Sequence, residues 1–184
     1  MAAAIGDHSD LTADMIGELL TYVEMTRSGL LLSNEHARDY GDGVWFPDER
    51  PLAPLRATLT YWIPRAFEIL TLIGSHNLIA APSKGMLDDA RLRPLIDKYL
   101  AGADDLDAEK RAAVFRLAWD FCGSALAGRH GLYERFYLGS AARNKKTLYM
   151  NAEGTMTGEP GPVKVWGDEL VEGMLTLGRT ASAS

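Results

Sequence analysis

The most restrictive feature of this sequence is the spacing of its apolar residues over two long stretches. The first stretch repeats them every three or four positions, at Leu11, Met15, Ile16, Leu19, Leu20, Val23, Leu30 and Leu31. This spacing predicts a helix over residues 11–36 with one broad apolar face, and Ser9, Asp10 and Thr12 can cap its start. The same pattern over residues 54–73 predicts a second long helix, which Pro64 should kink. Two helices of this length favour a helical bundle.

Shorter elements are expected in the rest of the chain. The pattern predicts further helices over residues 88–100, from Asp107 through Tyr137, over 140–150 with one basic face, and over 168–177. A short extended arm is expected at residues 163–166. The predicted fold class is therefore all-α. We expect residues 1–10 to form a loose tail, 11–150 the bundle, and 151–184 a C-terminal arm and short helix that ends in a loose tail.

A loop rich in glycine joins the two long helices at residues 39–48. Its apolar residues Val44, Trp45 and Phe46 are expected to pack into the core rather than stack on a ligand.

Composition excludes several classes of function. The chain of 184 residues has a net charge of -6, so no basic stripe is available for nucleic acid. The single cysteine, Cys122, excludes an internal disulfide and any multi-cysteine metal site. No apolar run approaches the ~20 residues of a membrane span. The first residues lack the features of a signal peptide, so we expect a cytoplasmic protein.

Residue patterns for common catalytic chemistry are absent. No glycine-rich phosphate loop follows a strand pattern, and no Gly-x-Ser-x-Gly motif occurs. The histidines have no metal-ligand spacing with one another or with carboxylates: His8, His36, His76 and His130. We therefore expect no metal site and assign no catalytic residue.

The densest group of functional side chains lies between Trp119 and Tyr137. Gly123 and Gly128 should weaken a helix there, by about 1 kcal/mol each relative to alanine. They therefore indicate close approach by another helix or a flat ligand. The polar residues that follow are Arg129, His130, Tyr133, Glu134, Arg135, Tyr137 and Arg143. They fit either a polar network between helices or subunits, or an anion site in which Arg129 binds phosphate or carboxylate.

The same region resembles a known family. Residues 123–129, GSALAGR, and 132–139, LYERFYLG, are similar to the signature near the end of the 4-hydroxyphenylacetate 3-hydroxylase family. Upstream motifs follow in the family's order at residues 16–19, 43–48, 82–83, 95–104 and 115–120. These enzymes are reduced-flavin-dependent aromatic monooxygenases with an acyl-CoA dehydrogenase-like fold. The resemblance covers roughly residues 11–149.

The resemblance implies a C-terminal helical bundle without the N-terminal and β-domains that supply most of the flavin pocket. It places Ser124, Ala125, Gly128 and Arg129 where the bundle meets FAD, and it transfers no catalytic residue. It also implies homo-oligomers, or hetero-oligomers with a chain that carries the missing domains. The first hypothesis is therefore one component of a split flavin monooxygenase.

Two alternatives remain open from the sequence. One is a repurposed, flavin-independent bundle that binds or cyclises a small hydrophobic intermediate. Its pocket would be lined by Trp62, Trp119, Tyr133 and Tyr137, with Arg129 or His130 polarising the substrate. The other is a structural assembly subunit without activity of its own.

Overall fold

The fold is almost entirely helical, as the sequence predicts. A computed structural model describes residues 1–137, 139–155 and 158–181. Its elements are η1 (Ala3–Ile5), α1 (Asp10–Glu35), β1 (Arg38–Asp39), β2 (Trp45–Phe46), α2 (Leu52–Gly74), α3 (Asn77–Ala80), α4 (Lys84–Asp88), α5 (Arg93–Tyr99), α6 (Ala108–Cys122), α7 (Ala125–Phe136), α8 (Ala141–Glu153) and α9 (Pro162–Ala181). Within the described part of the chain, no helix is both long and apolar enough to cross a membrane.

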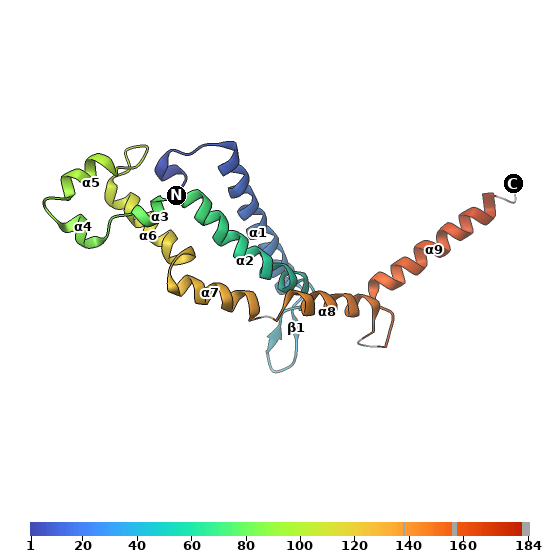
Figure 1. The fold of residues 1–184 in the computed structure, drawn as a ribbon. Coiled ribbons are helices and arrows are strands. Elements are labelled where there is room, and N and C mark those ends of the chain that lie inside the picture. Colours follow the sequence, from blue (N-terminus) through green and yellow to red (C-terminus); the bar gives the residue numbers. More distant parts are fainter. Residues whose placement is uncertain (138, 156–157, 182–184) are drawn as a thin grey trace.

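Helix α2 is the centre of the arrangement (Figure 1). It packs against α1 on one side and against α6, α7 and α8 in turn along its length. Pro64 lies inside α2 without ending the helix. The short helices α3, α4 and α5 gather around α6 at the end of the molecule farthest from α9 (Figure 1).

Side-chain caps explain where the helices begin. The hydroxyl of Ser9 accepts a hydrogen bond from the backbone N–H of Thr12, and the carboxylate of Asp107 accepts one from Lys110. Both caps were predicted. Ser140 caps α8 in the same way.

The buried core lies in three small clusters rather than one large one. Phe115 and Ile69 are almost fully buried, in separate clusters. The third cluster joins α4, α5 and α6 through Leu87, Ile96, Ala108 and Ala112.

The first residues are not a loose tail. Ala4 is buried against Leu78 and Phe115, and its carbonyl accepts a hydrogen bond from the N–H of Ala103 at 3.2 Å. The expectation for residues 1–10 is therefore wrong for this part. The apolar side chains of η1 fill a gap beside α6, so burial of their surface holds the segment in place.

The loop after α1 is a hairpin that stands away from the core (Figure 1). Strands β1 and β2 pair antiparallel, with Arg38 opposite Phe46. Val44, Trp45 and Phe46 are 51%, 64% and 54% exposed, so the predicted core packing is wrong. Phe46 packs instead on Tyr40 of the same hairpin, at 5.1 Å between ring centroids.

The C-terminal segment also differs from the prediction. Residues 163–166 are helical rather than extended, and α9 runs from Pro162 to Ala181, so the final helix is long. Pro162 suits the first position of a helix, where its missing N–H costs nothing. Helix α9 projects from the body and contacts α8 (Figure 1). Of the predicted terminal tail, residues 182–184 lie outside the described residues.

The molecule exposes more surface than a globular chain of its mass. Its accessible area is 13003 Å² for 20.1 kDa. A compact monomer of that mass exposes about 8,700 Å². Many large apolar side chains are exposed, including Leu20, Val23 and Leu31 of α1, which are at least half exposed.

Candidate functional site

The stretch from Trp119 to Tyr137 is two helices rather than one. Helix α6 ends at Cys122, where the carbonyl of Trp119 accepts hydrogen bonds from the N–H groups of Gly123 and Ser124. The Ser124 hydroxyl then caps α7 by accepting a hydrogen bond from the N–H of Ala127 at 3.1 Å. The predicted continuous helix is therefore wrong, because glycine and a capping serine end one helix and start the next.

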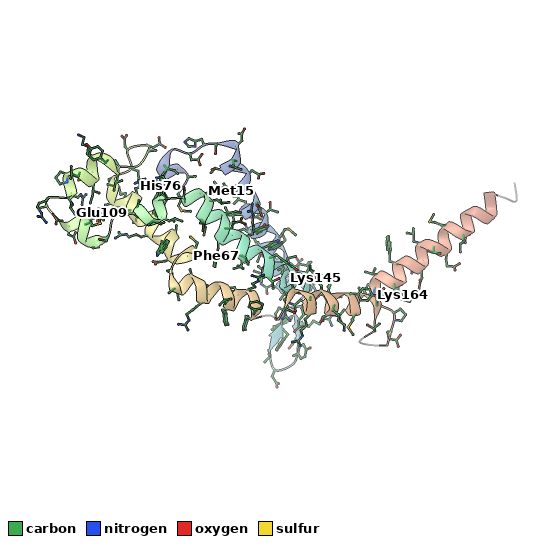
Figure 2. The ribbon with its side chains drawn as sticks, in the orientation of Figure 1. Met15, Phe67, His76, Glu109, Lys145 and Lys164 are labelled. Carbon is green, nitrogen blue, oxygen red and sulfur yellow. The ribbon has the colours of Figure 1, made fainter. Side chains whose placement is uncertain are left out.

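The glycines of this stretch have three different surroundings. A Cβ on Gly123 would lie 2.4 Å from the ring of Trp119, so the close approach there is made by the chain's own side chain. A Cβ on Gly131 would lie 2.9 Å from the ring of Phe67 on α2, which Figure 2 labels between α2 and α7. A Cβ on Gly128 would meet nothing within 4 Å. Of these three glycines, only Gly128 leaves room for a Cβ, and it lines a small pocket shared with Pro64 and Phe67 of α2.

Among the charged residues of α7, His130 and Glu134 form a local pair, whereas Arg129 and Arg135 have no ion pair within the described residues. His130 Nε2 lies 3.0 Å from Glu134 Oε1, one turn away on the same helix. Arg129 is exposed, and its guanidinium has no hydrogen bond or ion pair within the described residues. The predicted network between helices is therefore not formed by these residues, and Arg129 remains available to an anion.

Two tyrosine rings stack on each other near the end of α7. The rings of Tyr133 and Tyr137 stack with centroids 4.8 Å apart. Partial burial raises the pKa of Tyr133, and the neighbouring Tyr137 and Glu134 add to this shift. The Tyr133 phenol therefore stays protonated at neutral pH and can donate a hydrogen bond.

The structure does not bring the four predicted pocket aromatics together. Trp62 stacks on Tyr22 of α1 at 4.8 Å, between α1 and α2. Trp119 covers Gly123, while Tyr137 lines a separate pocket beside α8. The predicted common pocket is therefore wrong, because α2 presents Trp62 to α1 rather than to α7.

Two further cavities were missed by the sequence analysis. One is an apolar groove of about 680 Å³ between α1 and α2, lined by residues that include Leu19, Tyr22, Val23, Leu30 and Trp62. The other is a polar pocket of about 600 Å³ where α2, the end of α7 and α8 meet. The helical spacing of apolar residues on α1 predicts an apolar face, but it does not predict that a groove forms along that face.

A partly exposed ion pair between α1 and α2 orients side chains of the apolar groove. The guanidinium of Arg65 donates from Nη2 to Glu18 Oε2 at 2.9 Å, and the Tyr22 hydroxyl donates to the same carboxylate. These donors lower the pKa of Glu18, with the Arg65 hydrogen bonds as the larger cause. The pair thus orients Tyr22 and, through ring stacking, Trp62.

The residues at the start of α7 fit one side of a flat, anionic cofactor. Ala125 and Gly128 are small and exposed, and the first turn of α7 has backbone N–H groups directed outward. The Ser124 hydroxyl is already engaged, since it also donates to the carbonyl of Asp120 at 3.0 Å. Its contribution to a ligand would therefore come through its position. The described residues hold no group of three His, Cys, Asp or Glu side chains placed for a metal ion.

The fold is a helical bundle of the acyl-CoA dehydrogenase-like type. A 4-hydroxybutyryl-CoA dehydratase from N. maritimus shares this fold with a TM-score of 0.72 over 95% of the chain, at 18% identity. The family model described as 4-hydroxyphenylacetate 3-hydroxylase C terminal matches residues 1–158. The chain belongs to the 4-hydroxyphenylacetate 3-hydroxylase family.

Relatives with assigned names support this membership. The oxygenase component of 4-hydroxyphenylacetate 3-monooxygenase from Thermus thermophilus is 37% identical over 81% of this chain and 31% of its own length. A probable 4-hydroxyphenylacetate 3-monooxygenase from Bacillus subtilis is 29% identical over 74% of this chain and 28% of its own. A crystal structure of such an oxygenase component complexed with FAD matches with a TM-score of 0.80 at 32% identity, over 96% of this chain and 36% of that chain. This chain therefore spans about a third of the length of these relatives.

Proposed function

We propose that this chain forms the C-terminal wall of the flavin site in a reduced-flavin-dependent aromatic monooxygenase. The observation that carries the proposal is the first half of α7, where Gly128 is open and Arg129 is unpaired. A family relative binds FAD in its crystal structure, which supports flavin as the ligand. When bound, reduced flavin would supply the electrons for hydroxylation.

The chain's own residues would position and shield that cofactor. Gly128 and Ala125 would allow a flat ring system to lie against α7 without a side chain in the way. Arg129 would pair with a phosphate or another anionic group of the cofactor, because its planar fork suits bidentate binding. His130 and Tyr133 lie within one turn of Arg129 and would close the edge of the site toward the substrate.

The rest of the site would come from a polypeptide with the N-terminal and β-domains of the family. The excess exposed area of about 4,300 Å² over a compact monomer supports such a partner, together with self-association. The apolar face of α1 and the exposed face of α7 are the surfaces that partners would cover.

The test is complementation with a relative. The Thermus oxygenase component without its C-terminal third is co-expressed with this chain, and the copurified complex is assayed for flavin content and for hydroxylation of 4-hydroxyphenylacetate. We expect a complex that retains FAD. Arg129→Gln should lower flavin retention, whereas Arg116→Gln, which removes the same charge from α6, should not. A complex that forms without flavin, or no complex at all, would overturn the proposal.

A second candidate function rests on a different observation, the apolar groove between α1 and α2. Its volume of about 680 Å³ suits a small hydrophobic molecule. Under this proposal the chain binds or cyclises a hydrophobic intermediate without flavin. In a variant whose other three tryptophans are replaced by phenylalanine, the fluorescence of Trp62 reports on the groove. Saturable quenching or a shift by an apolar probe such as a naphthalene sulfonate, lost in Val23→Asp, supports the candidate. If the chain has only a structural role in assembly, we expect a stable oligomer that binds neither flavin nor a hydrophobic molecule.

A further inference from the structure

The polar pocket beside α8 concentrates positive charge in an acidic protein. Its lining comes from Arg56 on α2, Phe136 and Tyr137 at the end of α7, Gly139, and Arg143, Asn144 and Thr147 on α8. None of these residues is acidic, although the chain as a whole carries a net charge of -6. Lys145 and Lys146 follow on α8, the helix whose basic face was predicted from the sequence (Figure 2 labels Lys145).

The two arginines of this pocket have no ion pair, a state they share with Arg38, Arg116, Arg129 and Arg135 among the described residues. Ion pairs engage the side chains of Arg27, Arg50, Arg65, Arg91 and Arg93. The guanidinium groups of Arg56 and Arg143 form no hydrogen bond or ion pair within the described residues. Glu49 lines the adjoining pocket, which shares Arg56, Asn144 and Thr147 with this one, but it forms no ion pair with Arg56. Two like charges that line one cavity repel each other, so a bound anion would stabilise the arrangement.

The backbone around the pocket is held in place by a side-chain amide. Asn144 Nδ2 donates to the carbonyl of Arg56 at 3.0 Å and to that of Gly139 at 3.4 Å. These bonds tie the turn before α8 to α2, so the stems of Arg56 and Arg143 start from fixed positions. The Asn144 Oδ1 and the Thr147 hydroxyl have no other partner among the described residues, and Thr147 can donate to an oxyanion.

Aromatic rings form the remaining wall of the pocket. Phe136 and Tyr137 are 56% and 65% exposed. One face of the Tyr137 ring is covered by Tyr133. Stacking of a flat ring on such side chains contributes to binding of nucleotide bases irrespective of their identity.

We propose that this pocket binds a phosphate monoester carried by an aromatic ring system, of the chemical class of a mononucleotide. Arg56 and Arg143 hold the phosphate from α2 and α8, and Phe136 and Tyr137 contact the ring. The site is separate from the start of α7, because the 12 residues of that helix place its two ends about 18 Å apart. The inference therefore does not depend on the flavin site.

The test uses the full chain alone, without flavin, at fixed low salt. Isothermal titration measures adenosine monophosphate, adenosine and inorganic phosphate separately. We expect the monophosphate to bind most tightly, phosphate more weakly, and adenosine weakest of the three. Arg56→Gln and Arg143→Gln should each raise the Kd by about tenfold or more, while Arg116→Gln leaves it within about twofold.

Several results would overturn the inference. They are equal losses in all three variants, adenosine bound as tightly as the monophosphate, phosphate bound as tightly as the monophosphate, or no saturation at millimolar concentrations. Amide chemical shifts of the unmodified chain provide a check that needs no variant: the shifts of Gly139 and Asn144 should move on addition of the monophosphate, and those of Gly128 should not.

Discussion

Replacing Gly128 separates the stability of α7 from its proposed function. Glycine inside a helix costs about 1 kcal/mol relative to alanine. The added Cβ meets nothing within 4 Å, so Gly128→Ala should raise the free energy of unfolding by nearly that whole amount. For a chain of this size, the midpoint of thermal unfolding should rise by about 2–4 °C.

Gly131 supplies the matched control three residues further along the same helix. The propensity gain is the same, but its Cβ would lie 2.9 Å from the ring of Phe67. Overpacking of this kind costs about 1–3 kcal/mol, which cancels or reverses the gain. Circular dichroism during thermal and urea unfolding of both variants measures the difference. Equal destabilisation by the two substitutions would refute the view that the space beside Gly128 is open.

The same position then tests the flavin proposal. Gly128→Leu should leave the isolated chain folded, because the space around position 128 is open, yet it should reduce FAD retention in the complemented enzyme. A complex that keeps its flavin with leucine at this position would show that the cofactor lies elsewhere. A loss of stability that also abolishes complex formation would trace the defect to folding instead.

The other predictions concern the core and the hairpin base. Phe115→Ala should lower the free energy of unfolding by about 3–5 kcal/mol, whereas Phe121→Ala, at an exposed position on the same helix, should change it by less than about 0.5 kcal/mol in urea titrations. Ser33→Ala should cost about 1–3 kcal/mol, because the buried Ser33 hydroxyl donates to the carbonyl of Asp48 at 2.7 Å; wild-type stability in this variant would contradict the assignment. Hydrogen bonds from the side chain and backbone of Arg50 lower the pKa of Asp48 from 3.8 to about 2. The ionised Asp48 carboxylate therefore stabilises the fold fully above about pH 4, and this stabilisation is lost as pH falls toward about 2. The difference in urea midpoint between the wild-type chain and Asp48→Asn should shrink over the same pH range. A difference that stays constant with pH would contradict the role of the Asp48 carboxylate.

Periodicity and capping chemistry were sufficient to predict the helices that carry the fold. The apolar repeat of α1 and the caps at Ser9 and Asp107 act over one or two turns, so they can be read locally. The break between α6 and α7 was also signalled locally, by Gly123 followed by a capping serine. The apolar spacing continues across the break, and it therefore predicted one long helix instead of two.

Other features depend on contacts between distant residues. The segment Val-Lys-Val-Trp at 163–166 resembles a strand, but Pro162 starts a helix there and α8 packs against that helix. Three glycines in one stretch look alike in sequence, yet one faces Trp119, one faces Phe67 and one faces open space. Only the fold distinguishes them. The pairing state of Arg56, Arg129 and Arg143 likewise depends on which acidic residues the topology places nearby.

The projection of α9 sets how far this chain can reach. Its 20 residues span about 30 Å, which is the diameter of a small domain. Val163, Trp166, Leu170 and Met174 recur along it at helical spacing, and all four are about half exposed or more. The stripe begins beside α8 and runs outward, so a molecule that buries it would extend away from the bundle along α9. Helix α9 therefore allows this small protein to contact a partner well beyond the surface of its own bundle.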